Sequence, residues 1–211
     1  AFYSWGYLLR RSIATYLDID TTELEIGYGI SPVTHKPEIF IVEKLENGSG
    51  YCNYLSGRKY ANVPFDAMIK PLLEGGYLYE HLLNSQHRDS CLSSCYDCIR
   101  DYSNQQNHAL LDWRLGLDLA RLSANHSAEI SFNVDYWKDM LDKNLVYLLR
   151  KRHFNIKIKD ELYLACDDNF QIRGVIVHPL WSAEYINGLL DKYDMGNVEI
   201  ISIFELTRSL Y

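Results

Sequence analysis

Residues 90–122 read SCLSSCYDCIRDYSNQQNHALLDWRLGLDLARL. Three of the chain's five cysteines, Cys91, Cys95 and Cys98, fall inside eight residues of this stretch. Thiolates at this spacing, on a tightly turned backbone, can direct three sulfurs at one tetrahedral ion. A polar run and then an amphipathic helical pattern follow the cysteines. The stretch therefore predicts a metal-binding knuckle that joins two helical segments.

Other uses of these thiols fit the pattern less well. A disulfide would leave one of the three cysteines unpaired. A redox CxxC pair needs a βαβ context and a helix that begins inside the motif, and residues 95–98 have neither. No glutamate stands beside the cysteines to act as a general base, which argues against a catalytic zinc. We therefore expect a structural zinc site, with unmetallated thiols as the alternative.

A structural zinc site needs a fourth ligand. The nearest side chains of a suitable type are His87, Asp89 and His108, and Cys52 and Cys166 lie farther away in the sequence. Either histidine would otherwise be an ordinary surface or capping residue. Spacing alone leaves the identity of the fourth ligand open.

Composition and charge set limits on the function. Of 211 residues, 47% are apolar and 23% are charged, which is the balance of a globular protein with a real core. The net charge of −7 argues against a freestanding protein that binds nucleic acid by charge alone. Five cysteines and a start that does not resemble a signal peptide predict a reducing, cytoplasmic compartment, and no membrane partner is expected. The amphipathic start without methionine suggests the trimmed end of a longer product.

The first part of the chain is expected to mix helices and strands. Apolar periodicity and turn residues predict a helix over 2–19, a hairpin of strands over 23–30 and 38–45, a glycine-rich turn opening a helix over 46–55, and two short helices over 64–85 broken at Gly75-Gly76. The glycine-rich turn could hold an anion on its backbone N–H groups. It lacks the Lys-Ser/Thr pair of a P-loop, so a tight connection is the favoured interpretation.

The polar run around 125–131 divides the chain into predicted domains 1–124 and 125–211. The second domain should have the order α-β-β-β-α-β, with a helix over 133–153 capped by Asn133, strands over 154–158, 162–166 and 174–180, a Ser-capped helix over 182–193, and a last strand over 198–204. The fold class predicted is α+β: a zinc-knuckle module of helices and strands, followed by a small α/β layer.

Residues 93–119, SSCYDCIRDYSNQQNHALLDWRLGLDL, resemble the MrfA-type zinc-binding (MZB) domain. That domain closes many DNA helicases and forms the tail of DrmB-like proteins in anti-phage systems such as DISARM. The similarity extends upstream over roughly the first 122 residues, including the leading helix and strand and the segment IFIVEKLENGSGYCNYL. The most specific part is the block Ser94 to Cys98, together with Asn104-Gln105, His108 and Leu111-Asp112.

The resemblance implies a zinc-stabilised module that works beside a superfamily-2 helicase motor on DNA. Zinc ligation carries over to Cys91, Cys95 and Cys98. The family has a further cysteine just before this trio, about where Asp89 stands here, and His87 is our preferred replacement. The chain has neither a Walker A lysine nor a DExH box, so we expect it to hydrolyse no ATP itself.

Basic residues supply candidates for DNA contact. Those beside the knuckle are Arg100, Arg114 and Arg121, and a denser group around residue 150 comprises Arg150, Lys151, Arg152, Lys157 and Lys159. The polar run 104–107 could contact DNA or a motor subunit. The alternatives are a solvated loop for that run, and for the cations around residue 150 a helix end favoured by the helix dipole.

The second domain also raises the possibility of a nuclease. Its element order is that of restriction-type nucleases, and Asp167-Asp168 follow the second strand, but the third strand has no Glu-x-Lys to hold Mg²⁺ and activate water. His178 could be a general base, although a structural role is the alternative. The function predicted is therefore a non-catalytic, zinc-binding accessory of a DNA helicase or translocase in anti-phage defence. The competing functions are a Mg²⁺-dependent nuclease and a protein scaffold.

Overall fold

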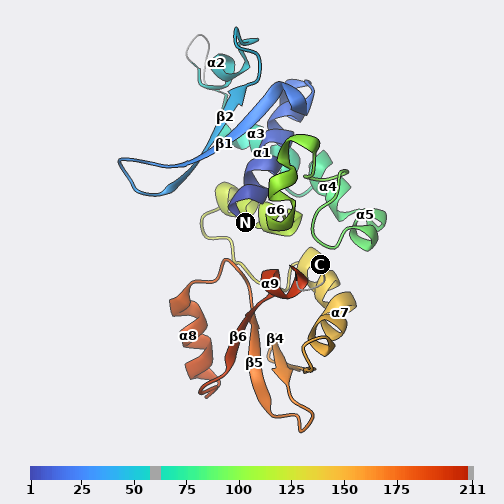
Figure 1. The fold of residues 1–211 in the computed structure, drawn as a ribbon. Coiled ribbons are helices and arrows are strands. Elements are labelled where there is room, and N and C mark those ends of the chain that lie inside the picture. The colour runs from blue at the N-terminus through green and yellow to red at the C-terminus, as the bar shows by residue number, and fades with distance from the viewer. Residues whose placement is uncertain (58–62, 209–211) are drawn as a thin grey trace. The chain divides into compact units, whose positions relative to one another are not determined.

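The computed structural model describes residues 1–57 and 63–208 and has the α+β fold class that the sequence predicts (Figure 1). Contacts between Cα atoms divide the chain into two compact units, Ala1–Ala128 and Glu129–Tyr211. The predicted boundary after residue 124 lies close to this division. No helix in the described ranges is long and apolar enough to cross a membrane.

Two helices from opposite ends of the first unit form its centre. α1 (Phe2–Leu17) packs along α6 (Trp113–Ala124), whose first turn is capped by Asp112. The Asp112 side chain accepts from the Arg114 backbone N–H at 3.0 Å, and the Asp112 backbone N–H donates to Ser4 Oγ at 2.8 Å. The N-terminus of α6 is thereby fixed to α1, and this pairing carries the residues on either side of the knuckle.

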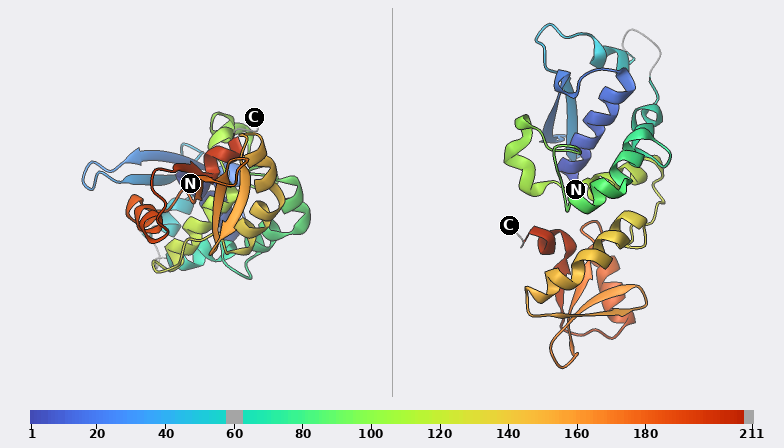
Figure 2. Two further views of the ribbon diagram at one scale, coloured as in Figure 1. Left: turned by 90° about the horizontal axis from the view of Figure 1, so that it is seen from below. Right: turned by 90° about the vertical axis from the view of Figure 1, so that its right-hand side faces the viewer.

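A β-hairpin lies beside α1, as the right-hand view of Figure 2 shows. β1 (Leu24–Ile30) pairs antiparallel with β2 (Pro37–Glu43), and the ring of Tyr28 packs against the aromatic side chains of α1. α2 (Tyr51–Leu55) follows the glycine-rich turn. The Glu43 carboxylate accepts from the backbone N–H groups of Gly50 and Cys52, each at 2.8 Å. The Glu43 carboxylate thus already occupies the N–H groups at the start of α2. The glycine-rich turn is therefore better interpreted as a tight connection than as a site for a bound anion.

Short helices connect the hairpin to the knuckle and the knuckle to α6. They are α3 (Phe65–Ile69), η2 (Lys70–Leu72), α4 (Tyr77–Leu83), α5 (Ser85–Ser90) and η3 (Tyr102–Leu110), with η1 (Thr21–Glu23) before the hairpin. The predicted break at Gly75-Gly76 is confirmed, and Gly75 there has a φ of 77° that favours glycine. The predicted polar loop 104–107 is instead part of η3. Asn104 is fully buried, because it forms a reciprocal capping box with Asp101.

The second unit has the predicted order of helices and strands. Its elements are α7 (Asp135–Arg150), β3 (Asn155–Lys159), β4 (Leu162–Cys166), β5 (Ile172–Val177), α8 (Ala183–Lys192), β6 (Glu199–Ser202) and α9 (Ile203–Arg208). The sheet order is β3-β4-β5-β6, antiparallel except for the β5–β6 pair, which α8 connects. Figure 1 shows this sheet between α7 and α8. Leu164 and Val175 lie in the core beneath α8.

Two local predictions in this unit are wrong. Val134, not Asn133, is the N-cap residue of α7, and the Asn133 side chain donates to Glu161 instead. The last strand ends at Ser202, because Ile203 and Phe204 begin α9. The Ser182 cap is confirmed, since its hydroxyl accepts from the Tyr185 backbone N–H at 3.1 Å.

Candidate metal centre

The structure brings His87, Cys91, Cys95 and Cys98 together. One ligand atom from each lies within 4.8 Å of the other three. The Cys98 sulfur is 3.8 Å from the Cys91 sulfur and 3.6 Å from the Cys95 sulfur. Sulfurs bound tetrahedrally at the usual zinc–sulfur distance of about 2.3 Å are separated by about 3.8 Å. The sulfurs are also much too far apart for a disulfide. The spacing therefore fits one tetrahedral ion.

The local backbone explains how four short-range residues converge. His87 lies on α5, and Cys91 directly follows that helix, where its N–H donates to the His87 carbonyl at 2.8 Å. The carbonyl of Cys95 accepts from three successive N–H groups, those of Cys98, Ile99 and Arg100. This winds the chain tightly enough to return Cys98 to the other two sulfurs. The Cys95 backbone N–H also donates to the Cys98 sulfur, at 3.0 Å.

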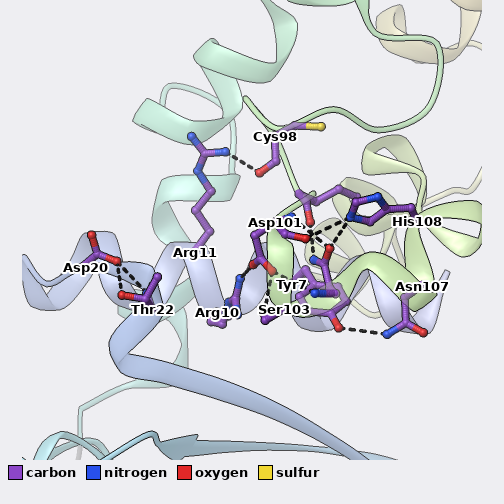
Figure 3. Close-up of polar contacts among 12 residues, drawn as sticks. Tyr7, Arg10, Arg11, Asp20, Thr22, Cys98, Asp101, Ser103, Asn107 and His108 are labelled. Atoms are coloured by element: carbon purple, nitrogen blue, oxygen red, sulfur yellow. Dashed lines mark hydrogen bonds and ion pairs between the residues drawn. The ribbon is translucent and has the colours of Figure 1, made fainter.

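Other elements of the unit hold the knuckle in place. Arg11 of α1 donates to the backbone carbonyls of Asp97 and Cys98, as Figure 3 shows for Cys98. The Arg114 side chain of α6 donates to the Leu92 carbonyl at 2.6 Å, and the Trp113 backbone N–H donates to the Ser93 carbonyl at 2.9 Å. The knuckle is therefore fixed to α1 and α6, the two helices at the centre of the unit.

His87 has the orientation of a metal ligand. Its Nδ1 lies 2.9 Å from the Leu82 carbonyl, which can only accept, so Nδ1 carries the proton. In the neutral ring Nε2 then presents a lone pair, and within the described residues this buried atom has no hydrogen-bond partner. A histidine that donates from one nitrogen to a backbone carbonyl and binds a metal through the other is the usual arrangement in protein metal sites.

Charge at the cluster favours a bound cation. Burial lowers the pKa of His87, but the Cys98 sulfur, the Leu82 carbonyl and the nearby Cys95 together raise it to about 9. Hydrogen bonding to Cys98, burial and the Cys98 charge raise the pKa of Cys95 well above its ordinary range. Cys98 contributes to both shifts, by hydrogen bonding and by its charge, and a positive charge at the cluster would offset that charge. A divalent metal ion would supply that positive charge.

The other candidates for the fourth ligand lie elsewhere. His108 Nε2 is 2.8 Å from Asn104 Oδ1 and 3.1 Å from the Asp101 carbonyl, so its ring supports η3 (Figure 3). Asp89 is exposed and is not one of the four clustered residues. Cys52 lies on α2, where its thiol donates to the Ile41 carbonyl, and Cys166 is buried in β4 of the second unit.

The proposal of Arg114 as a DNA contact is wrong. Its side chain is only 3% exposed, stacks on the Trp113 ring at 4.4 Å and pairs with Asp112 at 3.6 Å. Arg100 remains partly exposed, although its Nε donates to Ser94 Oγ at 2.8 Å. Arg121 is partly exposed and lies 3.8 Å from Asp118. Around the knuckle, Arg100 and Arg121 are the two predicted contacts that solvent reaches.

The five cations around residue 150 do not form a single patch. Lys157 and Lys159 stand opposite Leu164 and Leu162, on the sheet face that α8 covers. Arg150 and Lys151 end α7, which lies on the opposite face (Figure 1). Arg152 lies 3.7 Å from Glu199, which faces away from the α8 core. The strand period divides these charges between two faces of the sheet.

The residues proposed for a nuclease have structural partners. The Asp167 carboxylate accepts from the backbone N–H groups of Asn169 and Gln171 and pairs with Arg173 at 2.7 Å. These contacts, with that of Gln171 the largest, lower its pKa. Asp168 accepts from the Asn155 side chain at 3.3 Å. Both acids therefore shape the turn between β4 and β5.

His178 is 1% exposed and is enclosed by the rings of Phe132, Trp137 and Trp181. Its Nδ1 accepts from the Leu180 backbone N–H at 3.1 Å. The His178 ring thus stabilises the turn at Pro179 after β5. This contact supports the structural role for His178 over that of a general base.

Sequence reasoning did not find Arg10 and Arg11, which α1 directs at the knuckle region. Arg10 forms an ion pair with Asp101, and Arg11 reaches the knuckle carbonyls. The signal available was two adjacent arginines in an otherwise apolar helix, a pattern that does not reveal partners far away in the sequence.

Comparison with protein-family models, with curated proteins and with solved structures finds no match for this chain.

Proposed function

We propose that the first unit is a structural zinc module and that the protein is a non-catalytic accessory of a DNA helicase or translocase in anti-phage defence. The observation that carries the proposal is the cluster of His87 with three cysteines on one buried knuckle. Three thiolates and one imidazole are a donor set that suits tetrahedral Zn²⁺. With four protein ligands, no coordination position remains for substrate, so the site suits a structural role.

The metal would join segments that are distant in the sequence. Arg11, Trp113 and Arg114 all bind the knuckle through its backbone carbonyls, so the ion fixes the loop to which α1 and α6 attach. Structural zinc sites contribute about 10–16 kcal/mol of apparent binding energy, enough to decide whether a small module folds. A rigid module of this kind suits a part that docks beside a motor.

The helicase and defence roles rest on the resemblance of residues 93–119 and their upstream context to the MZB domain. The test is reconstitution with a superfamily-2 helicase from the same genome, followed by assay of DNA-dependent ATP hydrolysis and of phage plating. Addition of the wild-type protein should raise the motor's DNA-stimulated activity, and deletion of its gene should remove protection. A motor that behaves identically with and without the protein contradicts the proposal.

The nuclease is the alternative that a simple assay separates. Asp167 and Asp168 are held in a turn and β5 carries no Glu-x-Lys, so Asp167→Ala and Asp168→Ala should leave the phage protection intact if the turn still forms. Mg²⁺-dependent DNA cleavage by wild type that both substitutions abolish would favour the nuclease instead.

A further inference from the structure

A cavity of about 370 Å³ lies beside the metal centre, between α1, the knuckle and η3. Three arginines line it: Arg10 and Arg11 from α1, and Arg100 from the end of the knuckle. Asp101 is the one acid among the residues that line it, and Asp20 acts on Arg10 from nearby. The cavity is thus locally positive in a chain whose net charge is −7.

The arginines retain donors for a ligand. Arg10 is 8% exposed and pairs with Asp101 through one terminal nitrogen, yet its buried Nε has no hydrogen-bond partner within the described residues. Arg100 uses Nε on Ser94, and Arg11 uses one terminal nitrogen on the carbonyls of Asp97 and Cys98. The Arg10 Nε is closed to solvent, so it lies near the cavity without facing it, and the remaining nitrogens of Arg11 and Arg100 are the natural donors to an oxyanion there.

Two tyrosines that line the same cavity have rings that are mostly exposed to solvent. Tyr96 is 60% exposed and Tyr102 is 85% exposed, and their ring centroids are 6.3 Å apart. Tyr96 is fixed by an edge contact with His108 at 5.7 Å, whereas most of Tyr102 faces solvent. Aromatic rings beside clustered cations are the elements from which proteins build sites for unpaired bases.

We propose that this cavity binds one nucleotide unit of single-stranded nucleic acid, with the phosphate at Arg11 and Arg100 and the base against Tyr102 and Tyr96. The inference rests on the proposed function, and it names the strand form and the residues that the accessory recognises. A duplex is disfavoured because its bases are already stacked and paired, so they cannot lie on the tyrosine rings.

The metal centre and this cavity share a wall. Cys98 lines the cavity, and the carbonyls of Asp97 and Cys98 hold the Arg11 guanidinium at its edge (Figure 3). Zinc would therefore help to position Arg11, one of the residues proposed to bind phosphate, without contacting the nucleic acid. Binding is expected to require the metal-loaded protein.

The experiment measures the binding of a short fluorescent oligothymidylate and of a matched duplex to the zinc-loaded 211-residue chain at low salt. The single strand should bind more tightly than the duplex. Tyr102→Ala should weaken single-strand binding by about fivefold to 100-fold, and Tyr102→Phe should restore most of it because the ring remains. Arg100→Gln should weaken binding and flatten its dependence on log salt by about 0.7 for each phosphate that the variant no longer neutralises.

Tyr77→Ala is the matched control, since Tyr77 is 70% exposed in the same unit but does not line the cavity. It should bind the single strand like wild type. Zinc content and circular dichroism of each variant establish that it is folded. A shift of the Arg100 Nε–H resonance by inorganic phosphate as well as by the oligonucleotide would support the assigned phosphate position.

Equal binding by wild type and Tyr102→Ala, or a preference for duplex, would overturn the proposal. So would a shift of the Arg100 resonance with phosphate when the oligonucleotide does not bind, because the cavity would then take a free anion. None of these results depends on whether the protein stimulates the motor. That assay therefore tests the proposed function separately.

Discussion

Gly116 sets how closely α6 approaches α1. A Cβ atom at this position would lie 2.5 Å from Leu8 Cδ1 and 3.1 Å from the Ser4 carbonyl oxygen. Because Ser4 also binds the Asp112 N–H, the helices cannot separate there without breaking a buried hydrogen bond. The single missing side chain therefore fixes the helix pair to which the knuckle attaches.

Gly116→Ala should destabilise the first unit by about 1–3 kcal/mol, the usual cost of overpacking. Gly188→Ala in α8 is the control, since no atom lies within 4 Å of a Cβ there and alanine favours a helix by about 0.5–1 kcal/mol. Chemical denaturation of both variants measures the changes. Equal effects of the two substitutions would show that the close approach at Gly116 has no energetic consequence.

The Asp101–Arg10 pair predicts a pH dependence of stability. Burial raises the pKa of Asp101, but contacts from Ser103 and Arg10 outweigh it and hold the pKa below its ordinary value. The stabilisation is therefore present above the unfolded-state pKa of about 3.9 and is lost as the pH falls through the lower folded-state pKa.

Asp101→Asn should consequently be less stable than wild type at pH 7, and the difference should shrink as the pH falls below about 4. Denaturation of both proteins at a series of pH values measures this, and any acid release of metal affects both alike. A stability difference that stays constant down to a pH of about 2.5 would contradict the assignment.

Single residues also show where sequence reasoning succeeded and failed. The cysteine spacing correctly predicted that Cys91, Cys95 and Cys98 lie together, because a tight turn is determined by local sequence. Arg114 was misplaced because an arginine suggests solvent, although its position in the first turn of α6 puts it against Trp113. The burial of Asn104 had a readable signal in the sequence, the Asp-x-x-Asn spacing of a capping box.

At the scale of elements, α2 depends on an acid outside it. The short helix has no side-chain cap of its own, and the Glu43 carboxylate at the end of β2 satisfies two of the N–H groups at its start. Burial raises the pKa of Glu43, and the N–H groups of Cys52, Gly50 and Ser49 lower it to a net value below the ordinary one. Glu43 thus connects the hairpin to the glycine-rich turn.

Glu43→Ala should increase hydrogen exchange at the Gly50 and Cys52 amides, because their acceptor is removed. Glu43→Gln retains one acceptor oxygen and should give an intermediate rate. Glu25→Ala, an exposed acid on β1, is the control and should leave both amides unchanged. If Glu43→Ala exchanges like the control, the carboxylate does not hold the helix.

The order of helices and strands could be predicted because apolar periodicity is a local property of the sequence. Which residues face one another across the sheet could not be predicted, because strand pairing depends on distant parts of the chain. The order of the second unit was predicted correctly, yet Arg152 and Lys157 were assigned to one patch that the pairing of β3 with β4 divides. The prediction that the last strand continues to residue 204 was wrong for the same reason, since those residues begin α9. Ile203 and Leu206 are apolar at helical spacing, and tertiary burial decides between helix and strand.

At the scale of the whole molecule, one ion would organise the first unit. The zinc ligands come from a short stretch, but the contacts of the knuckle reach α1 at one end of the unit and α6 at the other. The second unit contains no group of three or more clustered metal-ligating side chains among its described residues. We therefore expect chelation to unfold Ala1–Ala128 and to leave the fold of Glu129–Tyr211 intact.

The central claim is that His87 and three cysteines bind one zinc ion, with His87 coordinating through Nε2. The direct measurement is the metal content of the purified 211-residue chain, combined with NMR of the His87 ring nitrogens. We expect about one zinc per chain, a protonated Nδ1 and a metal-bound Nε2. Cys95→Ser should lose both the metal and solubility, because metal binding and folding are coupled. A fully folded wild-type protein without metal, or a His87 ring that titrates freely in the zinc-loaded protein, would contradict the account.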